Sequence, residues 1–124
     1  METQAASDAT DLKRKLVAID REARLRSVAL AVNVVTKGGN SFAIIVGMRN
    51  RDSILTFNGL NGDPPYYVSE GNKLADLGMV KYVFGGERSE LPASHVIPYV
   101  LALKGLIDSI ESETPSSKIK WYGG

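Results

Sequence analysis

The chain has 124 residues, of which 44% are hydrophobic and 23% charged, and its formal net charge is +1. This length suits one domain, and the composition excludes wholesale disorder. The near-neutral charge argues against a strongly basic nucleic-acid binder and against a strongly acidic mimic of DNA. Cys is absent and His occurs once, so we expect no disulfide, metal or other cofactor.

The start of the chain predicts a tail followed by a helix. Residues 1–8 are small and polar, and they lack the basic and apolar regions of a secretory signal. We therefore expect a disordered tail and a cytoplasmic protein. Leu12, Leu16 and Ala23 recur at helical spacing among charged residues, which predicts a helix over residues 10–25.

Alternating apolar residues then predict several strands. Strands are expected at 27–37, 41–48, 53–58, 66–68, 79–84 and 118–122, with residues 85–90 as a surface loop. The first three have connections too short for a parallel crossover. Pro98 suits the first turn of a second amphipathic helix. The predicted fold class is α+β: an antiparallel meander packed against an N-terminal and a C-terminal helix, forming one domain over residues 9–124.

No residue pattern predicts a catalytic site. His95 lies just before Pro98, where a polar residue at a helix start is the simpler interpretation. Ser94 lacks the Gly-x-Ser-x-Gly context of a nucleophile elbow. Glu87 and Glu90 have the spacing of a carboxylate pair, but nothing nearby predicts the apolar pocket that would raise a carboxyl pKa. We expect a protein that is not an enzyme.

The second half of the chain, over residues 66–122, resembles the first-numbered family of immunity proteins of bacterial polymorphic-toxin systems. The resemblance lies in the order and spacing of short segments: Val68–Asn72, Tyr82–Gly86, Glu90–Pro92, Val96–Pro98, Pro115 and Ile119–Trp121. One departure is Tyr122, which follows Trp121 where family members often carry Glu or Gln.

The resemblance implies a non-catalytic inhibitor that is made beside a toxin delivered between bacteria. It implies a partner that is a toxin domain, often a nucleic-acid (cytosine) deaminase or a nuclease, whose active site the inhibitor blocks. Such a toxin presents a basic, concave site, which carboxylates and aromatic side chains can complement. The predicted toxin-binding residues are Asp63, Tyr66, Tyr67, Glu70, Asp76, Glu87, Glu90 and Trp121.

Two other functions remain open from the sequence. One is an adaptor domain that binds a different protein without catalysis. The other is a small nucleic-acid-binding protein that uses the basic residues of the first helix, although acidic residues interrupt them and the net charge of +1 argues against it. The sequence predicts no membrane contact and leaves the oligomeric state open.

Overall fold

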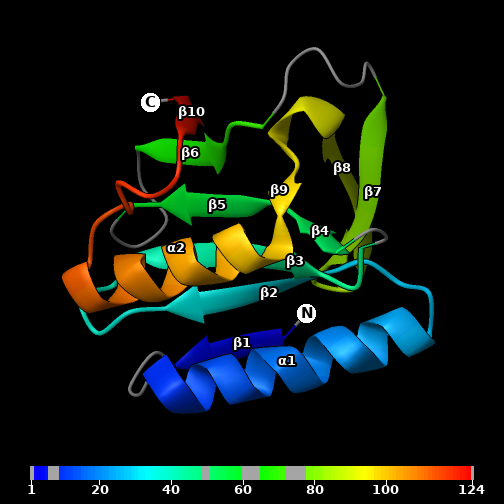
Figure 1. The fold of residues 1–124 in the computed structure, drawn as a ribbon, viewed down its shortest axis with the longest axis horizontal. Helices are drawn as coiled ribbons and strands as arrows, with labels where there is room; N and C mark the ends of the chain where they lie inside the picture. The colour runs from blue at the N-terminus through cyan, green and yellow to red at the C-terminus, as the bar shows by residue number, and fades with distance from the viewer. Residues whose placement is uncertain (1, 6–8, 49–50, 60–64, 72–77, 124) are drawn as a thin grey trace.

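The computed structural model describes residues 2–5, 9–48, 51–59, 65–71 and 78–123. It is an α+β fold in which two helices cover one face of a curled, mixed sheet (Figure 1). The helices are α1 (Ala9–Leu25), the short 3-10 helix η3 (Ala93–His95) and α2 (Tyr99–Ser112). The strands are β1 (Glu2–Ala5), β2 (Leu30–Val35), β3 (Ser41–Val46), β4 (Asp52–Ser53), β5 (Leu55–Asn58), β6 (Tyr66–Ser69), β7 (Met79–Phe84), β8 (Glu87–Pro92), β9 (Ile97–Pro98) and β10 (Trp121–Gly123).

The main sheet has the strand order β10-β6-β5-β3-β2-β7-β8, and β1 also pairs with β2. The predicted purely antiparallel meander is wrong, because both β1 and β7 run parallel to β2. Two parallel strands that are neighbours in a sheet need a long connection between them. Helix α1 connects β1 to β2, and the segment that contains β3 to β6 connects β2 to β7. The two helices are therefore not the ends of the fold, since β1 precedes α1 and β10 follows α2.

Two segments that were predicted to be irregular are strands. Within the predicted tail, Glu2–Ala5 forms a strand that pairs with residues 32–35 of β2. Strand β7 pairs with β2 only at Leu30, so the rest of that edge is available to β1. Within the predicted loop, only Gly85 and Gly86 form a turn, with φ angles of 59° and 81°, and β8 begins directly after them. Strand β8 is the edge strand of the described sheet, and an edge strand tolerates charged residues and a terminal Pro because only one of its sides is paired.

The main core lies between the sheet and the two helices, which face the viewer in Figure 1. Leu12 and Leu16 of α1 and Leu106 of α2 are fully buried against it. The sheet contributes every second residue of its central strands, as the pleat requires: Val32, Val34, Phe42, Ile44, Val46, Leu55 and Phe57. One-sided burial of this kind holds both helices on the same face.

A smaller core forms on the other face, where the sheet curls. Ala31, Ile45 and Ile54 are buried there, and the half-buried side chains packed on them are Ala29, Met48, Val68, Val80, Tyr82, Leu91 and Val96. The β7–β8 hairpin, which runs across the direction of the other strands at the right of Figure 1, supplies three of these residues. The hairpin therefore covers only the end of this face that lies nearest to it.

The end of α1 is held against the end of β3 at Gly47. Gly47 has a φ of 78°, and its N–H donates to the Asp20 carboxylate at 2.8 Å. A Cβ at this position would lie 2.6 Å from the Ala23 Cβ and closer still to the Val28 carbonyl oxygen. Only glycine therefore fits both the backbone conformation and the space.

We predict that Gly47→Ala lowers the free energy of unfolding by at least about 2 kcal/mol, because it adds a clash to the strain of a left-handed residue. Gly85→Ala is the matched control: Gly85 also has a positive φ, but nothing lies within 4 Å of its added Cβ. The control should lose only about 1 kcal/mol. Urea unfolding measures both, and equal losses would show that packing at Gly47 contributes nothing.

Candidate binding surface

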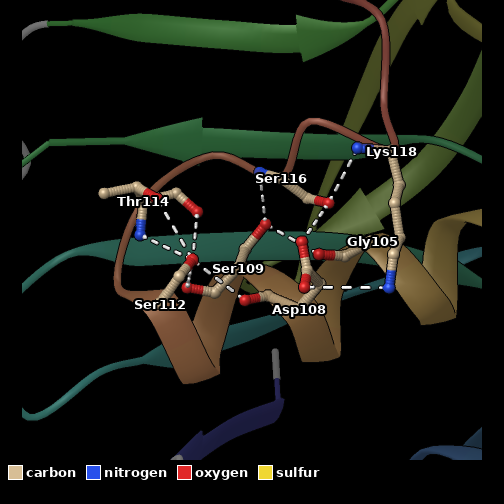
Figure 2. Close-up of polar contacts among 7 residues, drawn as sticks. All are labelled: Gly105, Asp108, Ser109, Ser112, Thr114, Ser116 and Lys118. Atoms are coloured by element: carbon tan, nitrogen blue, oxygen red, sulfur yellow. Dashed lines mark hydrogen bonds and ion pairs between the residues drawn. The ribbon is translucent and has the colours of Figure 1, made fainter.

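The densest polar cluster is at the end of α2, and it ties the C-terminal segment to that helix (Figure 2). Ser109 Oγ donates to the Gly105 carbonyl at 2.7 Å and accepts the Ser116 N–H at 2.8 Å. Ser116 Oγ donates to Asp108 at 2.6 Å, and Ser116 O accepts the Trp121 indole N–H at 2.9 Å. Because Ser109 and Ser116 are both buried, a substrate could not reach these hydroxyls, and we interpret the cluster as structural.

The single histidine does not form a nucleophile–base pair. Ser69 contacts His95, but Ser69 is fully buried and its Oγ donates to the main-chain carbonyl of His95 at 2.8 Å rather than to the ring. His95 Nδ1 lies 3.1 Å from Ser69 O, and the ring packs 5.4 Å from that of Tyr122. Triad chemistry needs a hydroxyl that donates to the imidazole, which this arrangement does not provide.

Metal binding and membrane insertion find no support in the described residues. Among them, no three His, Asp or Glu side chains come close enough to hold a metal ion together. No helix formed by this part of the chain is long and apolar enough to span a bilayer.

Two of the predicted toxin-binding aromatic residues lie in the main core. Tyr67 stacks on Phe57 with 5.9 Å between ring centroids, and Trp121 packs against Tyr67 at 6.3 Å. Both are half-buried on the helix side of the sheet. Their placement assigns them packing roles that attach β6 and β10 to the core.

The predicted acidic contacts do not form one patch. Glu70 forms an ion pair with Lys120 at 3.8 Å, and its side chain is only 10% exposed. Glu87 and Glu90 are exposed, but they are three positions apart along β8, so they lie on opposite faces of that strand. Asp63 and Asp76 lie outside the described residues.

Tyr66 is the predicted contact residue that the structure places on an open surface. It is 50% exposed and lies on the face of the sheet turned away from the helices. The strand register puts it in a row with Asn58, Ser41 and Val35. A second row, one pleat away, runs Tyr122, Val68, Thr56, Ala43 and Asn33.

These two rows form a surface that we call the open face: Asn33, Val35, Ser41, Ala43, Thr56, Asn58, Tyr66, Val68 and Tyr122. Every member is at least partly exposed, whereas the neighbouring residues of β2, β3 and β5 that point to the helix side are buried. None of the nine is charged, although 23% of the chain is. Tyr122, at 55% exposed, and Tyr66 are its large aromatic groups.

Sequence reasoning missed most of the open face because neighbouring residues are alike. Tyr66 and Tyr67 are both aromatic, as are Trp121 and Tyr122, so alternation alone does not say which of each pair faces the helices. The available signal was that residues 41–45 and 54–58 contain no charged side chain at all. That signal becomes a surface only when the register aligns the strands.

A buried polar cluster lies beneath the end of α1. Asp20 accepts from Arg24 Nε at 2.9 Å, and Arg24 Nη2 is buried with no partner among the described residues. Nearby, the Tyr99 hydroxyl is also buried and has no partner in that part of the chain. Burial raises the pKa of Tyr99 to about 12, and the Asp20 carboxylate adds to this while Arg24 opposes it.

We predict that Ser109→Ala lowers the free energy of unfolding by about 1–3 kcal/mol, because it leaves the buried Ser116 N–H without an acceptor. Ser112→Ala is the matched control on the same helix, since Ser112 is exposed and bonds only to nearby groups. The control should change stability by less than about 0.5 kcal/mol. Chemical denaturation of both variants measures the difference, and an unaffected Ser109→Ala would contradict the structural role of the cluster.

Tyr99 should make stability fall at alkaline pH. The folded protein holds the phenol proton up to a pKa of about 12, whereas the unfolded chain releases it near the ordinary value of 10.0. Between these values the unfolded state binds fewer protons, so stability decreases as pH rises. Tyr99→Phe should flatten this part of the stability–pH curve and change stability at pH 7 by less than about 1 kcal/mol, because the hydroxyl has no partner to lose. Identical curves for the two proteins would contradict the burial of this group.

Comparisons with protein families and with curated proteins found no match: no model of a protein family matches the chain, and no curated protein matches it either.

Proposed function

We propose that this protein is a cytoplasmic immunity protein that binds a cognate bacterial toxin domain and neutralises it without catalysing a reaction. The toxin is a nucleic-acid deaminase or a nuclease, and binding blocks its active site. This proposal takes the kind of partner from the family that residues 66–122 resemble. It takes the binding surface from the structure.

The observation that carries the proposal is the open face. Protein interfaces are depleted of charge at their centres and enriched in aromatic residues, and Tyr offers a large contact area at a small entropic cost. The open face has this composition, with Tyr66 and Tyr122 beside Asn, Ser and Thr side chains. A nucleic-acid ligand would instead call for Lys and Arg along the surface, and the open face has none.

The position of the open face also fits binding without loss of stability. Because the core on the helix side buries the opposite face of the same strands, side chains of the open face can change partner while the fold stays intact. The sheet is then a rigid platform, so that binding needs little ordering of the backbone.

The first test is co-purification of the tagged protein from the bacterium that encodes it, with mass spectrometry of retained proteins. We predict a stoichiometric partner that carries a deaminase or nuclease domain. The variant Tyr66→Ala with Tyr122→Ala should then bind this partner at least about 30-fold more weakly, as expected for two aromatic anchors at an interface centre. Its melting temperature should change little, because both side chains are at least half exposed and Tyr122 gives up one ring contact, with His95.

The matched control is Leu25→Ala with Val100→Ala, which removes two apolar side chains that are 77% and 55% exposed on the helix side. It should leave the affinity unchanged. A partner without any toxin domain would overturn the immunity function and favour an adaptor. If the tyrosine variant bound a toxin partner as tightly as the unchanged protein does, the immunity function would stand, but the open face would not be the interface.

A further inference from the structure

The sheet has a gap next to the start of β2. Leu30 is the first residue of β2, and it pairs with Val46 on one side and Val83 on the other. Before Leu30 the chain leaves the sheet for α1 through Ser27, which has a left-handed φ of 55°. The two neighbouring segments nevertheless continue past this point.

A cavity of about 410 Å³ occupies the gap. Gly47 and Met48, which extend beyond β3, line one side, and Val80 and Lys81 of β7 line the other. Ala29 still pairs with Val83, so the space opens just beyond it, where the chain turns away through Ser27. A second cavity of about 540 Å³ adjoins it, sharing Ser27, Ala29 and Lys81 as lining residues.

The β7 side of the gap carries unused main-chain hydrogen-bonding groups. Phe84 and Glu87 flank the two-residue turn and pair with each other, so alternate residues of β7 direct their N–H and C=O groups toward β8. Val83 and Lys81 then direct theirs the other way, and the Val83 N–H donates to Ala29 O at 2.9 Å. In the described part of the chain, no backbone group pairs with Lys81 on this side.

The two faces of the gap differ in chemistry. On the helix side, Arg24 and Lys81 line the cavity, and Arg24 is already ion-paired with Asp20. Arg88 lines the adjoining cavity together with the acidic Glu90. No ion pair with a described residue occupies Lys81 or Arg88. On the other side, Met48 and Val80 pack against the smaller core and present an apolar surface.

We propose that this gap binds an extended segment of a partner protein, in which carboxylate side chains alternate with apolar ones. Such a segment adds a short strand whose main chain pairs with the free edge of β7 at Lys81. Successive side chains of a strand point to opposite faces, so carboxylates meet Arg24 and Lys81 while apolar groups meet Met48 and Val80. The site is separate from the open face and does not depend on the partner there being a toxin.

The test is an NMR titration of the isotope-labelled protein with the blocked peptide acetyl-Asp-Val-Asp-Val-Asp-amide. We expect shifts confined to the amides of Gly47, Met48, Val80 and Lys81. The same peptide N-methylated at every residue should cause no such shifts, because it has no main-chain N–H left to donate to the Lys81 carbonyl. A Lys-Val peptide of the same length should also be inactive. Lys81→Glu should weaken binding by at least about five-fold, since it replaces an attraction with a repulsion.

Lys104→Glu is the matched control, because Lys104 is also exposed but lies on α2 away from the gap. It should bind the peptide like the unchanged protein. Equal shifts with the N-methylated peptide, or no shift with the acidic peptide at any concentration, would overturn the proposal. A stronger response at Lys81 and Arg88 to single-stranded oligothymidine would overturn it in favour of nucleic acid. None of these outcomes affects the co-purification test, so the proposed immunity function stands or fails separately from the proposed peptide site.

Discussion

The contact between α1 and Gly47 determines how the rest of the molecule is arranged. The Asp20 carboxylate accepts the Gly47 N–H, and Ala23 packs where a side chain of residue 47 would be. This contact fixes α1 across the end of β3, so the chain turns sharply through Ser27 and enters the sheet only at Leu30. The helix side of the sheet is thereby covered, and the gap beside β7 is a direct consequence of the late start of β2.

Coverage of one face then determines what the other face can do. Because α1 and α2 both pack on the same side, the opposite side is covered by the β7–β8 hairpin and by Met48 and Val96. These pack on Ala31, Ile45 and Ile54, and Val68 of the open face borders this smaller core. The open face is the part of that side of the sheet that stays uncovered. Its two tyrosines and small polar side chains suit a protein partner, while the basic rim of the gap suits carboxylates. The partners that we propose for the two surfaces therefore differ in chemistry.

Local signals in the sequence predict the elements better than their arrangement. The apolar spacing of Leu12, Leu16 and Ala23 predicts α1 nearly to its observed bounds, and residues 79–84 form the expected strand. Strand β8 was missed because the charges of an edge strand look like those of a loop. The parallel pairings of β1 and β7 depend on contacts between distant segments, which alternation does not encode. The same limit hides the open face, since the identical neighbours Tyr66 and Tyr67 point to opposite sides.

The central claim is that the protein acts through the open face of its sheet. Hydroxyl-radical footprinting of the free protein and of its complex with the co-purified partner tests this most directly. We predict that Tyr66 and Tyr122 are readily oxidised in the free protein and strongly protected in the complex, while the exposed Leu25 and Val100 react equally in both. Protection confined to the helix side, with Tyr66 and Tyr122 still reactive in the complex, would contradict the claim.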